Sequence, residues 1–358
     1  MSGGGNIKLW VVINDMKNIN IGINPNLEFI NSILLTSKYN EMTKPFIGYG
    51  LMTEERNPYT DAIKDFFAEY LSSPIYSTIE KMMPNGFTFS RPVELMLSLG
   101  NSKDFIIQYS LSELCLQYCG GMENILFLLE QLHRFSKEIN YFDFLETVKS
   151  YYDAYLPKIE THVNAYPYIS LLENIYGKEQ GSYNYVVSNL MVGNFGINFI
   201  NNQNDKSDLF SVFNLRDMVD TPETNEFNSG ALSVNILFHE FSHPFINPLT
   251  DKYFSIAEEY SSAYEWLKKY KLPDFKSGYG DWNECINEHF VRAMAIHLML
   301  KCDLKEWAER RLTNHLNEGY KYIPAILELY NYYEDNRTKY KTFDEFYPTL
   351  LKVFKEAV

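Results

Sequence analysis

The sequence predicts an α+β fold in which helices dominate, and three observations support this prediction. Amphipathic runs with helical spacing fill most of residues 27–155 and return near the C-terminus. Segments typical of strands are confined to residues 7–23 and 183–215. After the second strand group come two apolar stretches of helical character, Ser233–Leu249 and Asp281–Leu300. We therefore expect a small sheet packed on a core helix, with an additional helical domain.

The N-terminal segments predict a hairpin followed by helices. Ile7–Ile13 is typical of a buried strand, and Asn18–Ile23 alternates polar and apolar residues as a partner strand would. Leu27–Ser37 and Thr60–Leu71 have helical character, and Thr60 is the expected N-cap of the second helix.

Further helices are expected before residue 156, divided by turns at Pro84-Asn85-Gly86 and Gly120-Gly121. They cover Val93–Leu99, Ser110–Tyr118, Glu123–Lys137 and Tyr141–Tyr155. Strands are then expected over Tyr183–Val192, Phe195–Ile200 and Asp208–Leu215. The C-terminal helices are expected over Leu304–Leu316, Tyr320–Tyr333 and Phe343–Lys355. Two of them begin with possible capping boxes, formed by Asp303 with Glu306 and by Thr342 with Glu345.

The change from helical to strand-like segments, and back to helical ones, divides the chain into three predicted regions. Residues 1–180 hold the N-terminal hairpin and a mainly helical domain. Residues 181–302 hold the strands and the two apolar helices, and residues 303–358 hold C-terminal helices packed on that core. The sequence contains no fixed-period repeat and no low-complexity segment.

The apolar stretch Ser233–Leu249 contains His239-Glu240-Phe241-Ser242-His243, an HExxH motif. Residues four apart on a helix lie one turn apart on the same face, so both imidazoles can bind one metal ion. Glu240 projects beside them, where it can take a proton from a metal-bound water. The competing interpretation is a buried helix whose two histidines are only hydrogen-bonded. Because Pro244 follows the second histidine, the helix is expected to end or kink there.

A catalytic zinc site takes three protein ligands and leaves the fourth position for water, so a third ligand must lie elsewhere. Ile246 and Leu249 stand where the continuation HExxHxxGxxH needs a glycine and a third histidine, which excludes that continuation. The favoured candidate is Glu288, because the helix that carries it is apolar around its circumference and a buried carboxylate needs a partner. Arg292, one turn further on, would orient Glu288.

Alternatives to this ligand stay open. A plain helix ion pair with Arg292 would also explain Glu288. The other candidate ligands are Glu258, Glu259, Glu265, Glu284 and His289.

Composition and charge limit the class of partner. A chain of 358 residues with 28 Tyr and 25 Phe suits a packed globular protein, and a net charge of −14 argues against nucleic acid and anionic membranes. No apolar run approaches the ~18 residues that span a bilayer, so no membrane insertion is expected.

Residues 1–6 are too short and polar for a signal peptide, so a cytoplasmic location is expected unless a leader has been trimmed. The four cysteines form no CxxC pair and are expected to be buried thiols.

Several strings resemble known families. HEFSHPFINPL, followed about forty-five residues later by NEHFVRA, resembles the gluzincin arrangement of zinc metallopeptidases. YFDFLETVKSYYDAYL (Tyr141–Leu156) and YYEDNRTKYKTFDEFYP (Tyr332–Pro348) are also similar to a bacterial family known as domain of unknown function 4932, which has a predicted peptidase site. The resemblance covers most of the chain. It implies a zincin-like core, made of a small mixed sheet and the HExxH helix, with His239, His243 and Glu288 as zinc ligands and Glu240 as base.

We therefore expect Zn²⁺-assisted hydrolysis of a peptide bond in a peptide or protein substrate. Glu240 would pass the proton of water to the leaving amine, and Tyr279 is a candidate donor to the oxyanion. A strand ahead of the HExxH helix would form the edge of the cleft and could pair with an extended peptide. Two other interpretations remain: a zincin-fold peptide-binding module without turnover, and a structural protein whose motif is coincidental.

Overall fold

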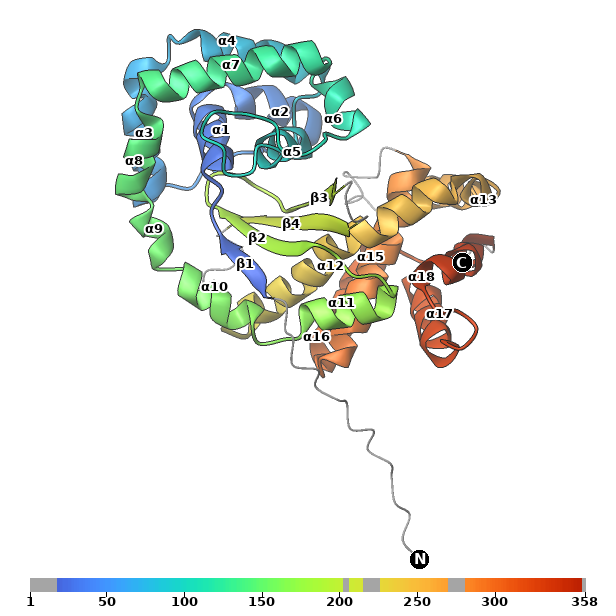
Figure 1. Cartoon of the computed structure of the whole chain (residues 1–358). Helices are drawn as coiled ribbons and strands as arrows, with labels where there is room; N and C mark the ends of the chain where they lie inside the picture. Colours follow the sequence, from blue (N-terminus) through green and yellow to red (C-terminus); the bar gives the residue numbers. More distant parts are fainter. Residues whose placement is uncertain (1–17, 202–205, 215–225, 270–280, 356–358) are drawn as a thin grey trace, which may run out of the picture.

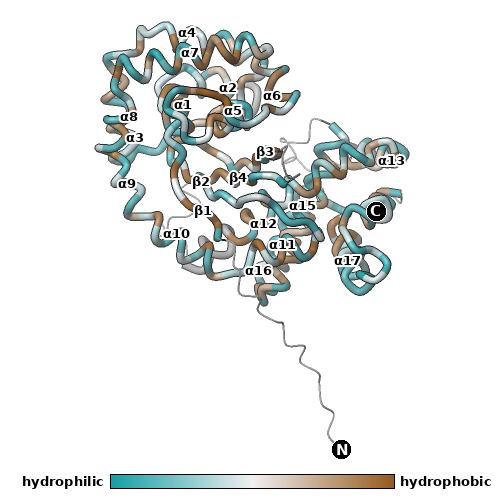
Figure 2. The backbone as a smooth tube through the Cα atoms, viewed as in Figure 1, coloured by the Kyte–Doolittle hydropathy of each residue, from teal (hydrophilic) through white to brown (hydrophobic). Residues whose placement is uncertain are grey.

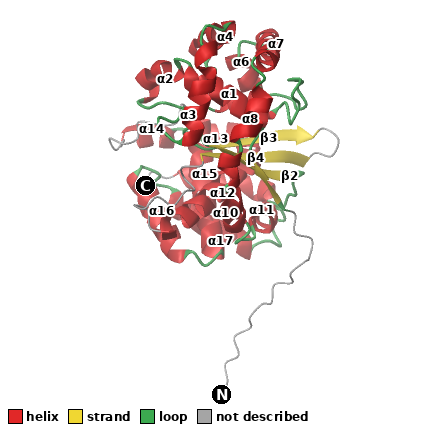
Figure 3. Cartoon of the chain, turned by 90° about the vertical axis from the view of Figure 1, so that its left-hand side faces the viewer, coloured by secondary structure: helices red, strands yellow, loops and turns green. Residues whose placement is uncertain are grey.

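One four-stranded sheet lies between two groups of helices (Figure 1 and Figure 3). The computed structural model describes residues 18–201, 206–214, 226–269 and 281–355. The strands are β1 (Ile19–Gly22), β2 (Ser182–Ser188), β3 (Phe195–Asn201) and β4 (Lys206–Asn214), in the spatial order β1-β2-β4-β3. β1 and β4 run parallel to β2, whereas β3 runs antiparallel to β4. The predicted helix-dominated α+β class with a small mixed sheet is confirmed.

The N-terminal helices gather on one side of the sheet, above it in Figure 1. They comprise α1 (Pro25–Thr36), α2 (Tyr39–Ile47), α3 (Pro58–Phe67), α4 (Pro74–Met82), α5 (Ser90–Leu97), α6 (Glu113–Tyr118), α7 (Met122–Glu138), α8 (Tyr141–Val148) and α9 (Ser150–Asp153). The helices predicted here are present. The one expected over residues 141–155 is divided into α8 and α9.

The opposite side of the sheet is covered by the helices that carry the HExxH motif and its neighbours. These are α10 (Leu156–Val163), α11 (Tyr168–Tyr176), α12 (Glu226–Lys252), α13 (Phe254–Glu258), α14 (Ser262–Lys269), α15 (Trp282–Lys301), α16 (Lys305–Asn317), α17 (Ile323–Asp335) and α18 (Phe343–Leu350). α12 is central, because it contacts β3 and β4 on one side and α15 on the other. Hydrophobic and hydrophilic residues alternate along the strands and along the helices around them (Figure 2).

The partner of the first strand could not be read from neighbouring sequence. Residues 7–13, the expected hairpin partner, lie outside the described residues. The expected strand at Asn18–Ile23 is present as β1, and it pairs in parallel with β2, with Ile19 opposite Tyr183. A strand from the predicted N-terminal region thus joins the sheet of the predicted core. The three-region division stays a prediction.

Two predicted helix caps are wrong. The N-cap of α3 is Asn57, whose side chain accepts from the N–H groups of Tyr59 and Thr60, both at 3.0 Å. Thr60 is instead the third helical residue, and its hydroxyl accepts from the Asn57 N–H to complete a capping box. At α16, the expected pair Asp303 and Glu306 forms no box, because Leu304 occupies the N-cap without a side-chain hydrogen bond.

The cap of α18 is confirmed in part. The Thr342 hydroxyl accepts from the Glu345 N–H at 3.3 Å. The Glu345 carboxylate, however, accepts from the Lys341 N–H at 2.6 Å and not from Thr342, so the reciprocal half of the box is displaced by one residue.

α12 continues through two internal prolines, Pro244 and Pro248, to Lys252. The helix therefore does not end at His243, and a kink at that point stays a prediction. Pro244 has no N–H to give the Glu240 carbonyl four residues earlier, which weakens the helix locally. Packing of α12 between the sheet and α15 offsets this loss and keeps both histidines on one continuous helix.

Within the part of the chain that the structure describes, no helix combines the length and apolar character needed to cross a bilayer.

Candidate metal centre

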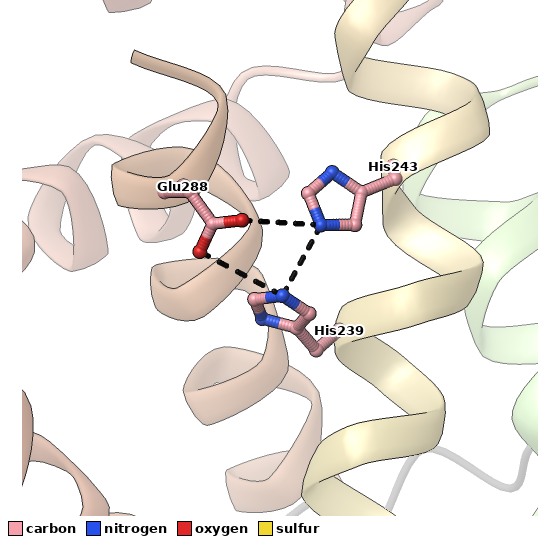
Figure 4. Close-up of side chains that lie close together, drawn as sticks. All are labelled: His239, His243 and Glu288. Atoms are coloured by element: carbon pink, nitrogen blue, oxygen red, sulfur yellow. Dashed lines mark hydrogen bonds and ion pairs between the residues drawn. The ribbon is translucent and has the colours of Figure 1, made fainter. Parts of the chain in front are cut away.

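Three potential metal ligands from two helices face one another (Figure 4). α12 supplies His239 and His243, one turn apart, and the packed helix α15 supplies Glu288. The two Nε2 atoms of the histidines are 3.1 Å apart. Glu288 Oε2 lies 3.8 Å from His239 Nε2, and Glu288 Oε1 lies 3.5 Å from His243 Nε2. No other group of three such ligands is found among the described residues.

These separations fit three corners of a tetrahedral zinc site. Zinc bonds of about 2.0–2.1 Å to nitrogen and oxygen place neighbouring ligand atoms roughly 3.3 Å apart. Two imidazole nitrogens and one carboxylate are also a ligand set that zinc uses in hydrolytic sites, with the fourth corner left for water. The residues present therefore fit a zinc ion in both donor chemistry and spacing.

Hydrogen bonds fix the orientation of two of the ligands. His243 Nδ1 lies 3.1 Å from Asn247 Oδ1. Because that oxygen can only accept, Nδ1 carries the proton and the lone pair of Nε2 faces the cluster. Arg292 Nε donates to Glu288 Oε2 at 2.9 Å, as expected for a residue that orients this carboxylate. Asn247 was not foreseen, although its position one helical turn after His243 made it detectable.

Burial lowers the pKa of His239 and raises the pKa of Glu240 beside it. The pKa of His239 is well below its usual value because of burial, with further lowering by the charges of His243, Arg292 and Arg311. Burial raises the pKa of Glu240 to about 7. The charge of Glu288 raises it further, while His243, Arg292 and a hydrogen bond from the Gly196 backbone lower it. Glu240 can therefore both take and give a proton near neutral pH.

The cluster opens into a cleft of about 390 Å³, a size suited to a small ligand or a short peptide segment. Besides α12 and α15, the start of β3 and the start of α5 contribute residues to its lining. The residues that line the cleft are Ser90, Asn194, Phe195, Gly196, His239, Glu240, His243, Asn247, Glu288 and Arg292.

The other candidate ligands lie outside this cluster. Glu258 ends α13, Glu259 follows it, Glu265 lies on α14 and Glu284 lies in the first turn of α15. His289 is fully buried, and its Nδ1–H donates to the Cys285 carbonyl at 2.8 Å. The buried thiol of Cys285 lies 3.7 Å from that imidazole and is not one of the three clustered ligands. Tyr279 lies outside the described residues.

β3 approaches α12 closely because residue 196 is glycine. A Cβ atom built at Gly196 would lie 2.7 Å from the Glu240 carbonyl oxygen and 3.1 Å from Glu240 Oε2. The same glycine donates its backbone N–H to the Glu240 carboxylate. Any larger side chain would push the strand away from the base. No sequence pattern predicts this contact, since a glycine within a strand has several possible causes.

Gly196→Ala is therefore expected to lower the free energy of unfolding by about 1–3 kcal/mol, the usual cost of overpacking. The matched control is Gly22→Ala in β1, where a new Cβ would meet no atom within 4 Å. Chemical denaturation of both variants measures the difference. Equal stability losses would show that the close approach of β3 to Glu240 is not tight in solution.

Comparison with known proteins places the chain in a family without assigning it an activity. A sequence profile of the family described as Domain of unknown function (DUF4932) matches residues 19–353. No curated protein matches the sequence. No solved structure matches it either. Because the match spans nearly the whole chain, this protein belongs to the DUF4932 family.

Proposed function

We propose that this protein is a zinc-dependent peptidase with a zincin-like core. The observation that carries the proposal is the placement of His239, His243 and Glu288 around one point, with the acid Glu240 in the same cleft. A coincidental HExxH string gives no reason for a third ligand to come from a separate helix. Nor does it explain why Asn247 and Arg292 orient two of the ligands.

His239, His243 and Glu288 would hold the zinc ion. When bound, zinc would lower the pKa of a water molecule to about 7 and polarise the substrate carbonyl. Glu240 takes a proton from the attacking water as its oxygen bonds to the carbonyl carbon. The same carboxyl then gives that proton to the leaving nitrogen as the C–N bond breaks. Its pKa of about 7 suits both steps.

The position of β3 at the edge of the sheet favours an extended peptide as substrate. β3 is the last strand of the sheet, and its second edge has no strand partner in the described part of the chain. Phe195 and Gly196 at the start of β3 line the cleft directly beside Glu240. A substrate backbone that hydrogen-bonds to this edge would lie along the cleft with its scissile bond near the base.

The test uses zinc-loaded protein and a pool of unfolded proteins. New peptide termini, identified by mass spectrometry, are expected with the zinc-loaded protein, and they should disappear after chelation and return on addition of zinc. If the fully zinc-loaded protein generates no new termini across many sequences, hydrolysis of peptides is wrong. Capture of the same peptides without cleavage would then favour a peptide-binding module.

A further inference from the structure

The C-terminal end of α16 is a well-defined turn, which we call the α16 turn (residues 315–320). Gly319 has a φ angle of +102°, a left-handed conformation that glycine adopts without strain. The N–H of Tyr320 donates to the His315 carbonyl at 2.9 Å, and the N–H of Gly319 donates to the Leu316 carbonyl at 3.2 Å. These two bonds form a Schellman motif, which fixes the path of the chain after the helix. The turn thereby brings Glu318 and the Tyr320 ring to the same imidazole, that of His315.

Three side chains of the α16 turn contact the guanidinium group of Arg292 on α15. The guanidinium carbon lies 4.3 Å from the centre of the Tyr320 ring, a distance typical of a cation–π contact. Arg292 Nη1 lies 3.3 Å from His315 Nδ1 and 3.8 Å from Glu318 Oε2. Arg292 Nε donates to Glu288 Oε2 at 2.9 Å. Arg292 therefore links the candidate metal ligand Glu288 to the α16 turn.

Burial and a hydrogen bond hold the α16 turn in place. His315 and Tyr320 are both buried. A hydrogen bond from His315 lowers the pKa of Glu318, and the charge of Arg292 lowers it further, so Glu318 is an anion at neutral pH. Because a carboxylate only accepts, His315 Nδ1 carries the proton and donates to Glu318 Oε2 at 2.9 Å. Glu318 is thus held as a second carboxylate beside Arg292, in addition to Glu288.

We propose that the α16 turn positions the metal ligand Glu288 by fixing Arg292. This inference rests on the zinc site of the proposed function. A fixed guanidinium holds the Glu288 carboxylate in one orientation, as the hydrogen-bond partners of metal ligands generally do. The charge of Glu318 also balances part of the charge of Arg292, which would otherwise repel a zinc ion in the same cleft. Both effects strengthen the binding of zinc, although no residue of the turn belongs to the ligand cluster.

Zinc affinity tests this role without an assay of hydrolysis. Glu318→Gln keeps the size of the side chain and removes its charge. Zinc affinity is expected to fall about three- to tenfold, less than the roughly ten- to hundredfold loss typical of a direct partner of a ligand. Competition with a chelator of known affinity measures the change. The matched control is Glu306→Gln, because this carboxylate lies on the same helix but is 63% exposed and pairs with Arg310. It should bind zinc as the wild type does.

Two substitutions of Tyr320 test the contact between its ring and Arg292. Tyr320→Phe keeps the ring and should bind zinc as the wild type does. Tyr320→Leu removes the ring and should bind zinc about threefold more weakly or worse, the range of a cation–π contact. Equal zinc affinities of these two variants would contradict the proposal. Glu318→Gln, at a half-exposed position, tests the same link if Tyr320→Leu does not fold.

A double-mutant cycle separates positioning through Arg292 from a general structural effect. If Glu318 acts through Arg292, Glu318→Gln should lose most of its effect on zinc affinity when Arg292→Gln is already present. An equal loss of affinity in both backgrounds would overturn the proposal, and so would wild-type zinc affinity in the single variant Glu318→Gln. If zinc affinity changes as expected but no peptide is cleaved, the positioning role stands and the peptidase function fails. A wild type that binds no zinc would overturn both.

Discussion

Glu240→Gln is expected to keep the zinc content of the protein and to reduce peptide hydrolysis by roughly a hundredfold or more, the loss typical of a positioned general base. Glutamine has the size and shape of glutamate but cannot take a proton. Glu240 is not among the clustered ligands, and its carboxylate already accepts the Gly196 N–H, so the amide oxygen can keep that bond. The metal site and the approach of β3 should therefore survive the substitution.

The measurement compares initial rates on one cleaved sequence, at equal zinc occupancy, for the wild type and Glu240→Gln. Glu265→Gln is a suitable control, because that carboxylate is 72% exposed and pairs only with Lys268 among the described residues. Equal rates for wild type and Glu240→Gln would mean that Glu240 is not the base or that the activity is a contaminant.

Glu288→Ala is expected to weaken zinc binding by at least about tenfold, since loss of even an outer partner of a zinc ligand has effects of that size. The substitution removes one of three protein ligands and also leaves the Arg292 guanidinium without the carboxylate to which it donates. Like charges from Arg292 and the metal would then face each other without the intervening anion.

Competition with a chelator of known affinity measures this change. Glu284→Ala and Glu258→Ala are the controls, because both residues were candidate ligands and neither belongs to the cluster. A large effect of Glu284→Ala with none from Glu288→Ala would show that the wrong face of α15 has been assigned.

Part of the arrangement in the candidate cluster was predictable, because helical geometry fixes the spacing within each helix. The four-residue spacing of His239 and His243 placed them on one face, and the apolar surroundings of Glu288 marked its carboxylate as one that needs a partner. The four-residue spacing of Arg292 likewise predicted its bond to Glu288. Each of these inferences uses only positions within one helix, where the sequence determines geometry almost directly.

The surroundings of the site were not predictable, because they depend on contacts between distant segments. The parallel pairing of β1 with β2 joins residues more than 160 positions apart, and no local pattern encodes it. The fit of Gly196 against Glu240 is of the same kind. Pro244 shows the converse case, in which local chemistry favours the end of a helix but packing between the sheet and α15 keeps it intact.

Zinc-edge X-ray absorption on the reconstituted protein tests the metal centre most directly. About one zinc per chain is expected, bound only by nitrogen and oxygen at about 2.0–2.1 Å, with outer-shell scattering from two imidazoles. The thiols of Cys115 and Cys119, whose Sγ atoms lie 3.8 Å apart, offer an alternative pair of metal-binding groups. Failure to retain zinc, or a sulfur shell at about 2.3 Å, would contradict the assignment of His239, His243 and Glu288 as its ligands.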